Sequence, residues 1–235
     1  MAGEGAALRV PFRDRVAAGK ALGERVAGRA GLHRPVVVAL VRGGVPVGAE
    51  VARQLGAPLL AMPVAKVGAP GQEELAVGAV APGGVSVLNE DVVVSLGLGA
   101  AEVDALVGRA AAKVAAEWRP CRGGDQFSLV GRAAVVVDDG LATGATMRAA
   151  LASVRQRAPS LLLMAVPVAP PEALEALAPL TDDCVCLVKP RHMRAVGAWY
   201  EDFTQITGEQ VSEALAELGP RARALGPGGQ NHALA

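Results

Sequence analysis

One segment combines acidic, glycine and threonine residues in an order that suits a phosphorylated sugar. The apolar run Val135–Val137 predicts a buried strand, and two adjacent carboxylates follow it. A loop rich in glycine and threonine comes next, and then a predicted helix whose free amides and dipole favour a phosphate. Carboxylates at the carboxyl end of a strand can bind a ribose diol. The predicted sugar phosphate contacts are Asp138, Asp139, Gly140, Leu141, Ala142, Thr143, Gly144, Ala145 and Thr146.

Other interpretations of this segment fit its residues less well. Asp139-Gly140 is a hairpin signal, but a helical pattern follows it instead of a second strand. The loop lacks the Gly-Lys-Ser/Thr of a P-loop, and its glycines do not fit the dinucleotide-binding spacing. A purely structural turn between a strand and a helix rarely needs this whole set of residues. The segment therefore predicts a sugar phosphate site.

The same segment resembles the signature by which type I phosphoribosyltransferases bind 5-phosphoribosyl-1-pyrophosphate (PRPP). The resemblance extends to a group of these enzymes with an unassigned acceptor, and it covers nearly the whole chain to about residue 215. The other similar stretches are Phe12–Arg15, Arg42–Pro46, Gly68–Gly71 with Glu74–Ala76, Pro167–Pro171, and Gly197–Tyr200 with Asp202-Phe203.

This resemblance implies transfer of the phosphoribosyl group of PRPP to a nitrogen acceptor, a nucleobase or related molecule, with release of pyrophosphate. It also implies Mg²⁺ as the cofactor, a role in nucleotide salvage, and small-molecule substrates as the main partners, and it leaves a homodimer open. The alternative is a PRPP-binding regulator of nucleotide metabolism that has no catalytic activity.

The resemblance assigns further roles outside the first segment. Arg42-Gly43-Gly44, after the predicted strand Val36–Val41, would bind the pyrophosphate; an ordinary Gly-Gly turn is the alternative. Lys66 lies where type I enzymes have a mobile loop and would neutralise pyrophosphate on closure; the alternative is a flexible surface loop. Asp139 is the candidate for proton transfer, and Asp138 is the candidate sugar anchor.

The acceptor and metal residues are predicted from a likeness to purine salvage enzymes. Val196, Trp199 and Tyr200 are the candidate acceptor contacts, and Glu201 is a candidate magnesium ligand. The alternative for the aromatic residues is that they pack the interior of the surrounding segment.

The two adjacent carboxylates should repel each other, which raises the pKa of one of them. We therefore expect Asp138→Asn and Asp139→Asn to leave the ligand-free fold as stable as before or slightly more stable. Each substitution should weaken the binding of Mg·PRPP.

Apolar strands that alternate with helices predict an α/β fold, with a mostly parallel sheet and helices on both faces. A domain over residues 1–218 is expected, with a core over 13–188, a small C-terminal lobe over 189–218 and a flexible tail over 219–235. The predicted core strands are Val36–Val41, Leu59–Val64, Ala134–Val137, Leu161–Val166 and Cys184–Val188, with a hairpin over Ala76–Val80 and Val85–Leu88.

Composition argues against several classes of protein. The 23 basic and 23 acidic residues balance, and aromatic residues make up 3%, so a nucleic-acid partner is not expected. Three cysteines without zinc-ligand spacing favour reduced thiols in a cytoplasmic protein. No apolar run approaches the roughly 20 residues of a membrane span, so no membrane partner is expected.

Overall fold

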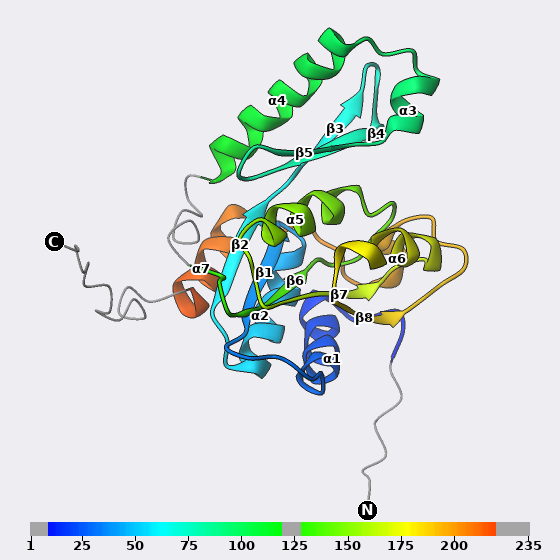
Figure 1. The fold of residues 1–235 in the computed structure, drawn as a ribbon. Helices are drawn as coiled ribbons and strands as arrows, with labels where there is room; N and C mark the ends of the chain where they lie inside the picture. The colour runs from blue at the N-terminus through cyan, green and yellow to red at the C-terminus, as the bar shows by residue number, and fades with distance from the viewer. Residues whose placement is uncertain (1–8, 119–127, 220–235) are drawn as a thin grey trace, which may run out of the picture.

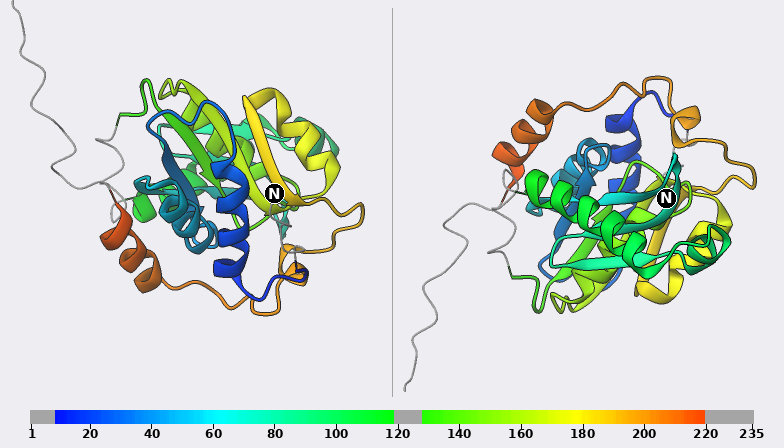
Figure 2. Two further views of the ribbon diagram at one scale, coloured as in Figure 1. Left: turned by 90° about the horizontal axis from the view of Figure 1, so that it is seen from below. Right: turned by 90° about the horizontal axis from the view of Figure 1, so that it is seen from above.

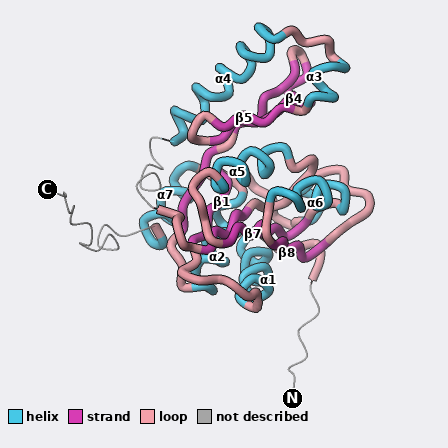
Figure 3. Tube along the Cα trace, in the orientation of Figure 1, coloured by secondary structure: helices cyan, strands magenta, loops and turns pink. Residues whose placement is uncertain are grey.

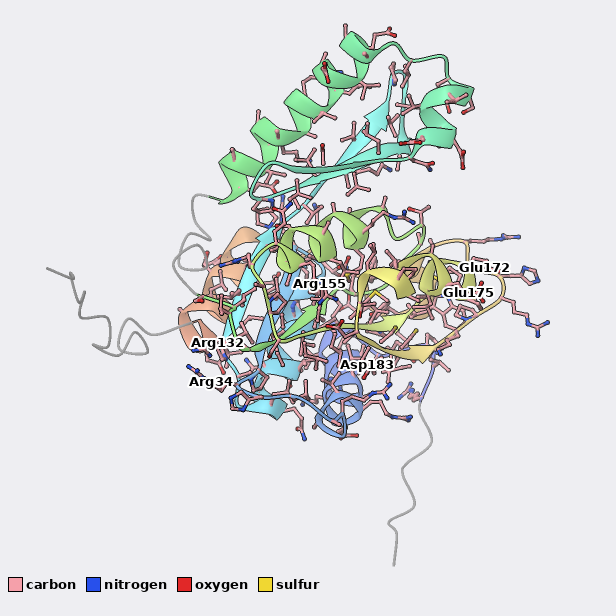
Figure 4. All side chains as sticks on the ribbon, in the orientation of Figure 1. Arg34, Arg132, Arg155, Glu172, Glu175 and Asp183 are labelled. Atoms are coloured by element: carbon pink, nitrogen blue, oxygen red, sulfur yellow. The ribbon has the colours of Figure 1, made fainter. Side chains whose placement is uncertain are left out.

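The central sheet consists of parallel strands that correspond to the apolar runs of the sequence. The computed structural model describes residues 9–118 and 128–219. Five strands pair in the order β2-β1-β6-β7-β8, and all neighbours are parallel. They are β1 (Val36–Val41), β2 (Leu59–Pro63), β6 (Ala133–Val137), β7 (Leu161–Val168) and β8 (Asp183–Val188). Arg34 and Arg132 precede β1 and β6 and lie at the amino edge of the sheet (Figure 4).

Helices cover both faces of this sheet (Figures 1 and 2). On one face lie α1 (Arg15–Ala27), α2 (Gly44–Leu55) and α7 (Gly208–Leu218); on the other lie α5 (Ala145–Arg155) and α6 (Pro171–Leu177). Residues of β1 alternate between the two cores, as the period of two of a strand requires: Val36 and Val38 pack with α5, whereas Val37 packs with α1 and α2. The α/β fold with a mostly parallel sheet is confirmed.

A second, antiparallel sheet stands over α5 and, together with the two helices that follow it, forms a layer that we call the hood, residues 65–118 (Figure 3). Its strands are β3 (Ala65–Ala69), β4 (Gln72–Ala81) and β5 (Val85–Leu88), followed by α3 (Glu90–Ser95) and α4 (Ala100–Trp118). Strands β4 and β5 form the predicted hairpin. The hood meets α5 through small residues, among them Ala79, Ala81 and Ala149, and Ser153 Oγ donates a hydrogen bond of 2.8 Å to the carbonyl of Pro82.

The mobile loop expected around Lys66 is instead strand β3, paired with β4. Its side chains alternate: Ala65, Val67 and Ala69 are buried, whereas Lys66 is exposed. The buried residues pack against α4, which gives the segment a folded partner. This alternation over five residues was the signal for a strand.

The region predicted as a C-terminal lobe has two parts. Residues 189–207 carry only the short 3₁₀ helix Val196–Trp199, and α7 then packs against α2 and β2. A further 3₁₀ turn, Ala178–Leu180, follows α6. Of the predicted tail, residues 220–235 lie outside the described part of the chain. No helix in the described part is long and apolar enough to cross a membrane.

Helices α1 and α2 cross so closely that the contact requires glycine. A Cβ on Gly19 would lie 2.8 Å from the carbonyl oxygen of Val47 and 2.9 Å from Cβ of Glu50. Similarly, a Cβ on Gly48 would lie 2.7 Å from Cβ of Ala39, so α2 also lies close to β1. By contrast, nothing lies within 4 Å of the Cβ position of Gly108, on the exposed side of α4.

Gly19→Ala should therefore destabilise the fold by about 1–3 kcal/mol, because the backbone of α2 must shift to admit the methyl group. Gly108→Ala is the matched control and should stabilise α4 by about 0.5–1 kcal/mol, since alanine loses less entropy than glycine in a helix. Urea unfolding followed by circular dichroism measures both. Equal midpoints for the two variants would contradict the close crossing.

Candidate functional site

The structure brings the two predicted glycine-containing clusters together at one edge of the sheet. Strands β1 and β6 are parallel neighbours, so their carboxyl ends lie side by side. Arg42-Gly43-Gly44 follows β1 and Asp138-Asp139 follows β6. A Cβ on Gly43 would lie 2.1 Å from Oδ2 of Asp139, so a side chain there would displace the carboxylate. The peptide bond between Val41 and Arg42 is cis.

Asp139 is held by a buried ion pair with Arg15. Nε of Arg15 donates to Oδ2 of Asp139 at 2.8 Å, and the two side chains are only 9% and 13% exposed. Nη1 of Arg15 donates to the carbonyl of Thr204 at 2.9 Å. The guanidinium carbon also lies 3.8 Å from the ring centroid of Phe203, within cation–π range. Arg15 therefore links α1, the end of β6 and the segment after Tyr200.

No chemical role was predicted for Arg15, although its position in the sequence carried a signal. Arg15 lies three and seven residues before Ala18 and Leu22, which are fully buried on the inner face of α1. A charged residue on that face must itself be buried, and a buried charge requires a partner. The pattern of the helix could thus have identified Arg15 as an ion-pair residue, but not its partner.

The electrostatics of the acidic pair are set by burial. Burial raises the pKa of Asp138 well above its ordinary value, and the neighbouring charge of Asp139 raises it further. The amide of Asp139 donates to Oδ1 of Asp138 at 2.9 Å, which partly opposes this shift. Burial also raises the pKa of Asp139, but the hydrogen bond from Arg15 acts in the opposite direction. Asp139 is thus the better supported of the two as an ionised carboxylate.

The loop after the acidic pair is fixed on its inner side and open on its outer side. Gly140 has no room for a side chain, because a Cβ would lie 2.6 Å from Val196 and 2.9 Å from Val168. The amide of Leu141, which is buried, donates to the carbonyl of Val168 at 2.9 Å. Ala142 and Thr143 are exposed. The inner residues therefore anchor a loop whose outer residues can contact a ligand.

Helix α5 begins at the end of this loop without a side-chain cap. Gly144 occupies the N-cap position with a φ of 77°, and no side chain bonds to the first amides of α5. Ala145 and Thr146 form the first turn, and both are half-buried. A cavity of about 620 Å³ separates the loop from the hood, and Thr143, Ala145 and Arg148 contribute to its lining. These uncapped amides and hydroxyls can bind a phosphate.

A second cavity, of about 370 Å³, lies beside Asp139, and we call it the catalytic cavity. Arg15, Arg42, Gly43 and Asp139 line it from the core, and Lys66 lines it from the hood. The remaining lining residues are Val41, Val64, Ala65, Lys113, Glu117, Phe203, Gln205 and Ile206. The structure thus places Arg42, Lys66 and Asp139 around a single space.

The residues predicted to bind the acceptor are partly or fully buried by other side chains. Tyr200 is 6% exposed, its ring packs between Phe12 and Phe203, and its hydroxyl donates to the carbonyl of Asp139. Protein atoms therefore cover its ring. Tyr200 was predicted to contact the acceptor, and this is corrected: Tyr200 supports the backbone of Asp139. Val196 and Trp199 are half-buried and stay predictions as acceptor contacts.

The predicted metal ligand, Glu201, is exposed and pairs with Arg9 at 2.8 Å. Within the described residues, no group of three or more His, Cys, Asp or Glu side chains is arranged to hold a metal ion. Glu201 as a magnesium ligand stays a prediction.

The two asparagine substitutions should have opposite effects on the ligand-free protein. Because the pKa of Asp138 is raised in the folded state, stability is lost as the pH rises from the ordinary value of 3.8 towards the raised pKa, and Asp138→Asn removes this penalty. Asp138→Asn should therefore be more stable than the parent protein at neutral pH, and the difference should vanish as the pH falls towards 3.8, the ordinary value.

Burial raises the pKa of Asp139 too, but Asp139→Asn leaves the buried Arg15 without its ion-pair partner, and this larger loss should destabilise the fold by about 3 kcal/mol. This reverses the expectation from the sequence. Thermal unfolding of both variants, measured from about pH 4 to neutral pH, tests whether their stabilities change in opposite directions. Equal stabilities for the two variants would contradict this prediction.

Known proteins are similar to this chain in sequence and in fold. A crystal structure of the protein TT1426 from Thermus thermophilus is 43% identical and covers 89% of this chain and 99% of that chain, with a TM-score of 0.73. Two curated Mycobacterium tuberculosis proteins, each named "Putative phosphoribosyl transferase", are 43% identical over 203 residues, or 85% of this chain. Only 45% of each of those proteins is matched, so this chain spans less than half of their length.

The family comparison covers the part of the chain that forms the site. A family model described as "Phosphoribosyl transferase domain" matches residues 15–189. That range begins at Arg15 and contains the Arg42-Gly43-Gly44 cluster, the hood and the segment from Asp138 to Thr146. The chain therefore belongs to the phosphoribosyl transferase family.

Proposed function

We propose that this protein transfers the phosphoribosyl group of PRPP to a nitrogen acceptor, a nucleobase or related molecule, and releases pyrophosphate. One observation carries the proposal: two helices begin with glycine at the ends of neighbouring strands, on either side of an acidic pair. Each helix start suits one phosphate-bearing end of PRPP, and the carboxylates suit the ribose hydroxyls between them.

Each group of residues would contact a different part of PRPP. The loop from Gly140 to Thr146 would hold the 5′-phosphate at the start of α5. The amides of Gly43 and Gly44, with the side chain of Arg42, would hold the pyrophosphate at the start of α2. Asp138 and Asp139 would accept hydrogen bonds from the ribose between these two ends.

In the reaction the bond between C1 of the ribose and the pyrophosphate oxygen breaks, and a bond from C1 to the acceptor nitrogen forms. Positive charge develops on the sugar and negative charge on the leaving group, so fixed charges lower the barrier. Arg42 and Lys66 would stabilise the leaving group from the catalytic cavity. Asp139, kept available as a base by Arg15, would accept the proton that the acceptor nitrogen loses.

Magnesium fits this site as an ion bound jointly with PRPP. The carboxylates of Asp138 and Asp139 would hold the ion, since Mg²⁺ in proteins is commonly held by one or two carboxylates together with substrate phosphates. Asp138 is the freer of the two, because Asp139 pairs with Arg15. When bound, the ion would neutralise charge on the pyrophosphate.

Pyrophosphate release from Mg·PRPP, measured across a panel of purine and pyrimidine bases, tests the proposed function. We expect at least one base to accelerate release above the rate of PRPP hydrolysis. Binding of PRPP without accelerated release by any base would favour the non-catalytic regulator. Absence of PRPP binding would overturn both assignments.

Thr146→Val should weaken the binding of ribose 5-phosphate by about tenfold or more, because a hydrogen bond to a charged group contributes about 1.5–3 kcal/mol. Valine keeps the β-branched shape, so the start of α5 should be preserved. Ser160→Ala is the control, since Ser160 is exposed and precedes β7 at the amino edge of the sheet. Calorimetry that shows equal affinities for the two variants would exclude a phosphate contact at Thr146.

A further inference from the structure

The hood contains a cavity of its own, of about 490 Å³, between β3 and α4. Three cationic side chains line it: Lys66 from β3, and Arg109 and Lys113 from α4. The other lining residues are Val67, Gly68, Ala69, Pro70, Gly71, Leu106 and Ala110. Among the described residues that line this cavity, three are cationic and none is acidic.

The requirements of folding do not account for this arrangement of charge. Leu106 and Ala110 bury the inner face of α4 against the hood sheet, whereas Arg109 and Lys113 are exposed. Arg109 and Lys113 are four residues apart on one helix, a spacing at which like charges destabilise the helix. A bound anion would offset the repulsion between Arg109 and Lys113.

The hood cavity adjoins the catalytic cavity through shared residues. Lys66 and Lys113 line both spaces, so they form the boundary between them. Arg109 lines the hood cavity and not the catalytic cavity, whereas Arg42 and Glu117 line the catalytic cavity and not the hood cavity. The cationic groups therefore continue from the predicted pyrophosphate contacts around Arg42, past Lys66 and Lys113, to Arg109 in the hood.

We propose that the hood cavity is a subsite for the outer phosphate of a linear polyphosphate, such as the chain of a triphosphate-bearing molecule. This inference rests on the proposed function, because the two inner phosphates would occupy the place of the pyrophosphate of PRPP. An acceptor is a less suitable occupant, since it must reach C1 from the side opposite to the departing pyrophosphate. A triphosphate bound across both cavities would compete with PRPP and so regulate the enzyme.

Calorimetry with inorganic pyrophosphate and with tripolyphosphate, each with Mg²⁺, tests the subsite, because the affinity should rise with the length of the polyphosphate. The parent protein should bind tripolyphosphate at least tenfold more tightly than pyrophosphate. Arg109→Gln should remove most of this preference while it leaves the affinity for PRPP unchanged, because Arg109 lines the hood cavity and not the catalytic cavity. Lys113→Gln should weaken the binding of both polyphosphates.

Lys20→Gln is the charge-matched control, since Lys20 is an exposed cation on α1, outside both cavities. Lys20→Gln should keep the full preference for tripolyphosphate over pyrophosphate. This result would distinguish a specific subsite from a general attraction of the protein for anions. If Arg109→Gln and Lys20→Gln prefer tripolyphosphate equally, the subsite is excluded even if PRPP binds. If the parent protein does not bind PRPP, the proposed function fails instead.

Discussion

The ion pair between Arg15 and Asp139 is the interaction on which the rest of the site depends. It joins the first helix to the end of the central strand β6, and the same guanidinium holds the carbonyl of Thr204 and stacks on Phe203. Burial of both partners makes the pair sensitive to the loss of either one, because an unpaired buried charge is costly. The segment from Val196 to Thr204 is held against the sheet edge largely through contacts with Asp139, Arg15 and Phe12.

Close backbone contacts set the spacing around this pair. The Cα of Gly43 lies against the carboxylate of Asp139, and Gly44 lies against the backbone at Val137 and Asp138. On the other side, Gly140 fits beneath Val168 and Val196. A side chain at any of these positions would push apart elements that must converge on one substrate. Glycine is thus required at Gly43, Gly44 and Gly140 by the close approach of neighbouring atoms, since none of the three has a positive φ.

Much of the fold was predictable from the sequence because its signals are local. The apolar runs at Val36–Val41 and Ala133–Val137 are the central strands, and the placement of Asp138 and Asp139 at a strand end follows directly from the second run. The strand at Lys66 was missed because the resemblance to a mobile loop outweighed a clear alternation of buried and exposed residues. The packing of Tyr200 and the pairing of Arg15, 124 residues from Asp139, depend on contacts between distant segments, which no local pattern records.

The contact between the hood and α5 is made mainly of alanine and valine side chains and of one hydrogen bond from Ser153 to Pro82. Such a contact lets a sheet lie very close to a helix, and helix α5 begins at the loop that carries Thr143 and Gly144. The hood thus rests on a single helix, and the first turn of that helix follows the loop directly. The position of Lys66 and Lys113 at the catalytic cavity is therefore tied, through one helix, to the position of the loop that precedes α5.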